Sequence, residues 1–268
     1  MPNYICTTCG VEYDLTPLPP EKCLICEDER QYINWKGQSW TTLEELRKRH
    51  HNSIKAVEPG LFEIGTQPGF AIGQRPLLIQ TQSGNILWDC TCLVDSEIKG
   101  EITALGGISA IAISHPHFYS TMIEWSREFG GIPIHLHAAD RQWVMHPDPA
   151  IQFWNGEKHA LGNGLTLVRV GGHFEGSTVL HWEAGAGGRG VIMTGDMPQV
   201  VSDRRYVSFM RSYPNLIPVN AAAVRHIVQA LEPLQFDRIY GGWFDRFILQ
   251  KAKESIKQSV ERYLSSIQ

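Results

Sequence analysis

One segment decides which fold this sequence predicts: Ile111-Ala112-Ile113-Ser114-His115-Pro116-His117-Phe118-Tyr119-Ser120. Its apolar first half is typical of a buried strand, and two histidines follow at i and i+2 where that strand is expected to end. Alternate residues of an extended chain point to the same side, so both imidazoles can face one site. We therefore predict that His115 and His117 are ligands of one metal ion, since chelation needs this shared direction.

Two further potential ligands lie in loops that follow predicted strands. His173 stands in the run Gly171-Gly172-His173-Phe174-Glu175-Gly176-Ser177, and Asp196 ends the run Thr194-Gly195-Asp196. Loops that follow strands are where functional sites are usually built. His135 and His137 form a second pair with the same spacing and are the alternative source of ligands, although we expect them to be structural.

In this order the three motifs resemble those of the metallo-β-lactamase superfamily, over about residues 56–245. The resemblance implies an α+β fold, a four-layer αββα sandwich, with its metal site at the ends of strands. It also implies that Asp89 orients the metal ligands without binding the metal itself. Asp89 ends the run Gly84-Asn85-Ile86-Leu87-Trp88-Asp89. The alternative is that Asp89 is a simple turn residue.

The sequence departs from the superfamily's first motif, HxHxDH. Tyr119 and Ser120 stand where that motif has its Asp and second-site His, and the run Ile239–Asp245 has Trp243 but no His where the last family histidine is expected. The resemblance therefore implies a single metal ion on His115, His117 and His173, with Asp196 nearby. We expect zinc or another divalent metal, iron and manganese being the alternatives.

Cys6-Thr7-Thr8-Cys9 and Cys23-Leu24-Ile25-Cys26 form the pattern CxxC-x13-CxxC. Four thiolates from two tight turns give the closed tetrahedral shell of a structural zinc ion, so we predict a zinc ribbon in residues 1–40 that folds independently. The first pair also resembles a knuckle of rubredoxin, whose cysteines hold a redox-active iron, and iron is the alternative metal. Cys90 and Cys92 are expected to be ordinary buried residues.

The predicted organisation is a zinc ribbon at 1–40, a linker helix within 41–53 and an αββα domain at 54–268. The glycine-rich run 185–190 is predicted to be a hairpin loop, because it lacks the ending of a phosphate-binding loop. Strands are expected at Leu61–Ile64, Phe70–Ile72, Leu77–Thr81, Ile86–Trp88, Ala110–Ser114, Ile132–Leu136, Leu165–Val170, Thr178–Trp182 and Gly190–Thr194, and helices at about 42–50, 120–129, 219–231 and 245–266.

Composition excludes some classes of function. The net charge of the 268-residue chain is −4, with 24 Lys and Arg against 28 Asp and Glu, and no long basic block is present, which argues against a nucleic-acid partner. The N-terminus lacks a signal peptide and no apolar run is long enough to span a bilayer, so we expect a soluble cytoplasmic protein with no membrane partner. The sequence does not predict the oligomeric state.

These observations favour a metal-dependent hydrolase acting on a small-molecule substrate that the sequence does not identify. Asp196 would be a ligand or the base for the attacking water, and Tyr119 would donate a hydrogen bond to a developing oxyanion. One alternative is a degenerate domain kept for binding, with the zinc ribbon docking a partner. Another is a redox protein with iron on its four cysteines.

Overall fold

The buried strand predicted near residue 111 belongs to a seven-stranded sheet in the order β3-β4-β5-β6-β7-β8-β9. The computed structural model describes residues 1–267, and their contacts divide them into two units. Unit 1 contains Met1–Leu136 and Arg141–Phe153, and unit 2 contains His137–Asp140 and the chain from Trp154 onward. Each unit has one large sheet, so a mixed α+β fold is observed.

The strands and helices up to residue 154 are β1 Ile5–Cys6, α1 Leu24–Glu27, β2 Trp40–Thr41, α2 Leu43–Arg47, β3 His51–Glu58, β4 Leu61–Gln67, β5 Leu77–Ile79, β6 Ile86–Trp88, α3 Ser96–Ala104, β7 Ala110–Ala112, the 3-10 helix η1 Pro116–Phe118, α4 Met122–Glu128, β8 Ile134–His137, the 3-10 helix η2 Ala138–Trp143 and β9 Ile151–Trp154. The opening strands β3 to β6 are antiparallel, as predicted. β6, β7 and β8 are parallel. Parallel strands end at the same edge, so the residues after β6 and β7 come together there.

The later elements are β10 Lys158–Gly162, β11 Leu165–Arg169, β12 Thr178–Trp182, α5 Gly185–Gly188, β13 Val191–Thr194, β14 Gln199–Val200, β15 Val207–Ser208, β16 Met210–Ser212, β17 Ile217–Pro218, α6 Ala221–Leu231, β18 Arg238–Tyr240, β19 Phe247–Ile248 and α7 Ala252–Ser266. The sheet of unit 2 has the order β10-β11-β12-β13-β18-β19. β13 and β18 are parallel, so Asp196 and Trp243 follow strands that end at one edge. The glycine-rich run joins antiparallel β12 and β13 through α5, a single turn, as a hairpin.

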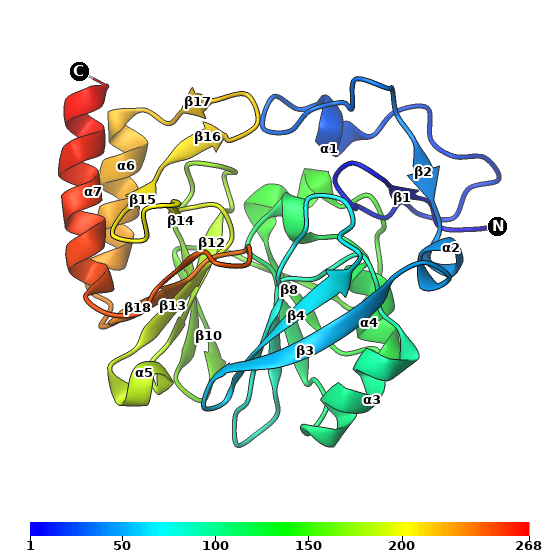
Figure 1. Ribbon diagram of the computed structural model, residues 1–268, viewed down its shortest axis with the longest axis horizontal. Helices are drawn as coiled ribbons and strands as arrows, with labels where there is room; N and C mark the ends of the chain where they lie inside the picture. The colour runs from blue at the N-terminus through cyan, green and yellow to red at the C-terminus, as the bar shows by residue number, and fades with distance from the viewer. Residues whose placement is uncertain (268) are drawn as a thin grey trace. The chain divides into compact units, whose positions relative to one another are not determined.

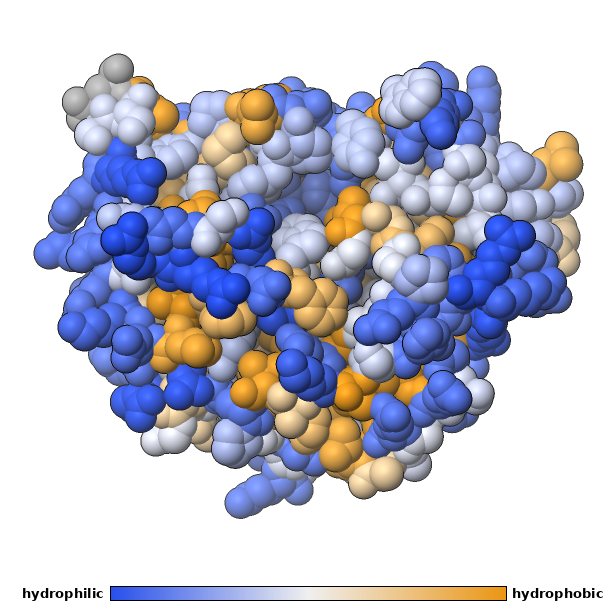
Figure 2. Space-filling model, in the orientation of Figure 1, coloured by the Kyte–Doolittle hydropathy of each residue, from blue (hydrophilic) through white to orange (hydrophobic). Residues whose placement is uncertain are grey.

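The helices α6 and α7 lie side by side (Figure 1) and cover a core made with strands of unit 2. Asn220 begins α6 because its side chain accepts a hydrogen bond from the Ala223 N–H at 2.9 Å. On α7 only Ala252, Ile256 and Ser259 are buried. Figure 2 shows hydrophilic side chains along the left edge, where α7 lies. Amphipathic helices of this kind bury one stripe and leave the rest in water.

Four expectations about elements were wrong or incomplete. The predicted strand Phe70–Ile72 is a turn, because Ala71 has φ 51° and Gly73 has φ 71°. The last helix starts at Ala252 instead of 245, since Phe247–Ile248 pairs with β18 first. The sequence analysis missed β3, a largely exposed edge strand without apolar alternation, and α3, which buries only Ile98 and Ile102.

The cysteine-rich residues share a core with the rest of unit 1. Ile5, on β1, packs in one buried cluster with Leu46, Cys92 and Leu93. A Cβ atom on Gly10, which has φ 85°, would overlap the sulfur of Cys92, so only glycine allows this close approach. This packing argues against independent folding of residues 1–40, while the predicted domain boundaries stay a prediction.

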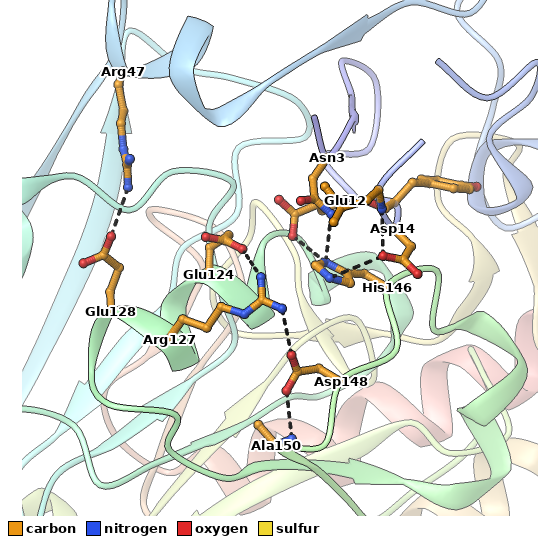
Figure 3. A network of polar contacts seen from close by, with 12 residues as sticks. Asn3, Glu12, Asp14, Arg47, Glu124, Arg127, Glu128, His146, Asp148 and Ala150 are labelled. Carbon is orange, nitrogen blue, oxygen red and sulfur yellow. Dashed lines mark hydrogen bonds and ion pairs between the residues drawn. The ribbon is translucent and has the colours of Figure 1, made fainter. Parts of the chain in front are cut away.

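A buried contact between a carboxyl group and an imidazole adds to this packing. Figure 3 shows Glu12 and Asp14 directed toward His146, whose Nδ1 lies 2.9 Å from Glu12 Oε2. The side chains of His146 and Glu12 are 6% and 2% exposed. Burial is the main cause that raises the pKa of Glu12, and the hydrogen bond from His146 opposes it. Within residues 1–267, no helix is both long and apolar enough to cross a membrane.

We expect His146→Ala to lower the free energy of unfolding by about 3 kcal/mol, because the Glu12 carboxyl would stay buried without its partner. Urea unfolding measures this change, and limited proteolysis should show faster cleavage within residues 1–40. His51→Ala is the matched control, since His51 is exposed on β3. Equal unfolding midpoints for the two variants would contradict a role for the Glu12–His146 pair.

Candidate metal centres

The four cysteines of the paired CxxC motifs form one buried cluster. The sulfurs of Cys6 and Cys26 are 3.7 Å apart and those of Cys9 and Cys23 are 3.6 Å apart. All four sulfurs lie within 4.8 Å of one another. Sulfurs bound about 2.3 Å from one zinc ion lie about 3.8 Å apart in a tetrahedron, whereas a disulfide is about 2.05 Å long. The spacing therefore fits a metal ion and not a disulfide.

A cation would stabilise the ionised form of this cluster. Hydrogen bonds within the cluster lower the pKa of the Cys6 thiol, and the bond with Cys23 is the largest cause. Burial raises the pKa of Cys9. Four thiolates this close repel one another in a buried site unless a cation lies between them. Gln38 Nε2 donates a hydrogen bond to Cys6 Sγ at 3.2 Å, which supports a negatively charged sulfur. The four-cysteine cluster can therefore hold metal.

The first two histidines are fixed by the end of β7. The Asp89 carboxylate accepts a hydrogen bond from the Ser114 N–H at 2.7 Å, and Ser114 Oγ lies 2.9 Å from His115 Nδ1. Asp89 has φ 64° where β6 ends, which turns its carboxylate toward the neighbouring strand. His115 precedes η1, and the centroids of the His115 and His117 rings are 5.2 Å apart. Asp89 thus contacts the backbone that carries the histidine pair.

His173 has the hydrogen bonding expected of a metal ligand. Its Nδ1 lies 3.2 Å from the carbonyl oxygen of Met210, which can only accept, so Nδ1 carries a proton and Nε2 carries the lone pair when the imidazole is neutral. Nε2 lies 3.3 Å from Asp196 Oδ2. A lone pair and a carboxylate oxygen repel each other at this distance unless a proton or metal ion lies between them. Metal-bound histidines commonly donate their other N–H to a backbone carbonyl in this way.

Asp196 is itself held by neighbours within unit 2. Gln199 Nε2 lies 3.5 Å from Asp196 Oδ1, and the Tyr213 hydroxyl donates to the Asp196 carbonyl oxygen at 3.1 Å. Burial raises the pKa of Tyr213, so its hydroxyl stays a neutral donor. These residues leave Oδ2 as the oxygen that faces His173.

The predicted ligands form two buried pairs, one in each unit. In unit 1 the ring centroids of His115 and His117 are 5.2 Å apart, and in unit 2 His173 Nε2 lies 3.3 Å from Asp196 Oδ2. Imidazole nitrogens and carboxylate oxygens are donors that zinc accepts, so each pair can supply metal ligands.

The remaining candidates are placed as follows. Tyr119 is buried at the end of η1, and the Ser120 hydroxyl donates to the Cys90 carbonyl at 3.2 Å. Trp243 is half-buried after β18. His137 donates from Nε2 to Gly156 and accepts at Nδ1 from Ala139, so neither nitrogen offers a lone pair to a metal.

Sequence reasoning missed the groups that orient His173 and Asp196. Met210, Gln199 and Tyr213 lie between β13 and α6, where short strands β14 to β17 alternate with turns. No motif marks a backbone carbonyl acceptor, so the partner of His173 Nδ1 had no sequence signal.

Known proteins place this chain in a family. The uncharacterized protein YmaE of Bacillus subtilis (strain 168) is 49% identical over 269 aligned residues, covering 100% of this chain and 97% of YmaE. The chain belongs to the YmaE family. No protein-family model matches it.

Solved structures show the fold of this YmaE-family chain. The crystal structure of VMB-1 gives a TM-score of 0.60 at 12% identity, covering 81% of this chain and 99% of VMB-1. The metallo-β-lactamase FIM-1 from Pseudomonas aeruginosa, solved in a mono-zinc form, gives a TM-score of 0.57 at 15% identity, covering 80% of this chain and 96% of FIM-1. DIM-1 metallo-β-lactamase gives a TM-score of 0.57 at 12% identity, covering 80% of this chain and 98% of DIM-1. The predicted metallo-β-lactamase fold and the four-cysteine cluster near the N-terminus are confirmed.

We expect Cys9→Ser to remove one metal ion per chain, because three thiolates and a hydroxyl no longer give a closed shell. Elemental analysis of purified protein measures the loss, and the visible spectrum distinguishes colourless zinc from iron. Since Ile5 shares a core with Cys92 and Leu93, the variant should also unfold at lower urea concentration as a whole. Cys90→Ala is the control and should keep its full metal content. Unchanged stoichiometry in Cys9→Ser would contradict the assignment of a metal ion to the four cysteines.

Proposed function

We propose that this chain is a metal-dependent hydrolase of a small-molecule substrate, with one metal ion on His115, His117, His173 and Asp196. The observation that carries the proposal is the buried contact between His173 Nε2 and Asp196 Oδ2, which lie 3.3 Å apart and need a proton or a metal ion between them. The other two imidazoles, His115 and His117, lie together in unit 1 with their ring centroids 5.2 Å apart.

A bound metal ion of this kind supplies an ionised water near neutral pH and polarises a substrate oxygen. Asp196 would accept a proton from the attacking water, because its buried carboxylate lies beside His173. Met210 fixes the tautomer of His173, so that Nε2 keeps its lone pair. Tyr119 would donate a hydrogen bond to the substrate oxygen that gains negative charge.

We propose a single zinc ion at this centre and a structural zinc ion on the four cysteines. Ser120 replaces a second-site histidine, and its hydroxyl is already bonded to the Cys90 carbonyl. A neutral tyrosine is a poor ligand for a divalent ion at neutral pH, since its ordinary pKa is about 10. Iron and manganese are the alternatives at the histidine centre, and iron at the cysteines.

We also propose that the protein works in the cytoplasm. All six cysteines are free thiols in the structure. A reducing compartment keeps four clustered thiols available to a metal ion, whereas an oxidising one would pair them.

The second candidate function is binding, with the cysteine-rich residues docking a partner. Within that part of the chain Trp35 is 88% exposed and Leu18 is 75% exposed, and large exposed apolar side chains mark many interaction surfaces. A metal-loaded protein inactive toward every class of hydrolysable bond would favour this candidate.

We expect Asp196→Asn to lower hydrolysis about 100-fold and His173→Ala to weaken metal binding at least about tenfold. The assay is a panel of chromogenic esters, thioesters, lactams and phosphodiesters, with the zinc-loaded protein, and metal affinity is measured by chelator competition. Asp203→Asn is the control, because Asp203 pairs with Arg205 at the surface of the same unit. Equal rates for Asp196→Asn and Asp203→Asn would refute the assignment of Asp196.

A further inference from the structure

A single buried amide joins the backbone of the cysteine cluster to the backbone of the histidine pair. Gln74, which is 2% exposed, donates from Nε2 to the Cys9 carbonyl at 2.9 Å and to the His117 carbonyl at 3.1 Å. A carboxamide nitrogen carries two hydrogens, so these two bonds use its whole donor capacity. All three residues belong to unit 1.

Two more contacts connect the same segments. The Glu12 N–H donates to the Ser120 carbonyl at 3.1 Å. Gly10 packs against Cys92, whose thiol lies 3.7 Å from Gln74 Oε1. The turn Cys9–Glu12 therefore lies directly against the segment that carries His117.

The histidine segment is short and has hydrogen bonds at both ends. Asp89 fixes it before His115 through the Ser114 N–H. Beyond His117, Ser120 has φ 43°, a strained conformation for a residue with a side chain. Gln74 bonds the His117 carbonyl at this far end, while Glu12 and Cys90 bond Ser120. Metal ligands must be held within about 0.5 Å of their productive positions, so the position of the His117 backbone affects metal affinity.

The turn that presents the Cys9 carbonyl depends on metal at the cysteines. The Gly10 N–H donates to the Cys6 carbonyl at 2.8 Å, and the Cys6 N–H donates to the Val11 carbonyl at 3.0 Å. Both cysteines of this turn belong to the cluster whose sulfurs repel one another when they are ionised without a cation. Loss of the metal would therefore loosen the acceptor that fixes Gln74.

We propose that Gln74 is a positioning residue that couples the two metal centres, so that metal on the four cysteines raises the affinity of the histidine centre for its own metal ion. The proposal rests on the histidine centre of the proposed function. Coupling between sites is reciprocal, so metal at the histidines also slows the loss of metal from the cysteines. The cysteine cluster then supports metal binding at the histidine centre, in addition to stabilising residues 1–40.

The test is Gln74→Leu in the full chain, which keeps a side chain of similar size and removes both donors. Zinc affinity of the histidine centre, measured by chelator competition with the cysteines loaded, is expected to fall about tenfold. Gln80→Leu is the matched control, since Gln80 Nε2 donates to the Leu105 carbonyl at 3.0 Å in the same unit. Wild-type affinity in Gln74→Leu would overturn the proposal.

A second measurement separates coupling from a loss of stability. His173→Ala should speed zinc release from the cysteines to a thiol reagent when Gln74 is present, and should have no such effect in the Gln74→Leu background. Equal acceleration in both backgrounds would overturn the proposal, because independent effects add and coupled effects do not. Acceleration by His173→Ala that depends on Gln74, without hydrolysis by the wild-type protein, would refute the hydrolase and uphold the coupling.

Discussion

The structure depends on one constraint: buried electron-pair donors that face one another need a proton or a metal ion between them. Four sulfurs are buried within 4.8 Å of one another, and His173 Nε2 lies 3.3 Å from a carboxylate oxygen of Asp196. In a medium of low dielectric constant such arrangements are unfavourable without a positive charge. The hydrogen bonds around both groups hold the donors in place, as expected of a site prepared for metal.

Sheet topology explains how the donors reach their positions. β6 and β7 are parallel, so Asp89 and the Ser114 N–H meet at one edge and the histidine pair is fixed immediately beyond it. β13 likewise ends in the loop that carries Asp196, whose backbone is held by Tyr213. The short strands between β13 and α6 supply the Met210 carbonyl that sets the tautomer of His173. Each donor therefore has a rigid element on one side and a hydrogen-bonded loop on the other.

The cysteine-rich residues belong physically to unit 1. Ile5 lies in a core with Leu46, Cys92 and Leu93, and the Glu12–His146 pair is buried in the same unit. A segment this small gains stability from the surface on which it packs, and a metal ion on the four cysteines would add to it. Its contact with the histidine segment through Gln74 gives a physical reason for the two modules to occur in one chain.

The sequence by itself determined the strands around the motifs and the two groups of metal-binding residue types, because apolar runs and closely spaced ligands are local signals. The metallo-β-lactamase fold was predicted from the resemblance that these motifs carry in their order along the chain. It also indicated, through Tyr119 and Ser120, that a second metal site lacks its ligands. It did not reveal β3, whose residues are mostly exposed, or the turn at Ala71, which depends on backbone dihedral angles. Only the tertiary structure decided that Gln74 joins Cys9 to His117 and that Met210 orients His173, because each of these bonds joins residues far apart in the chain through backbone carbonyls, which every residue has and no motif marks.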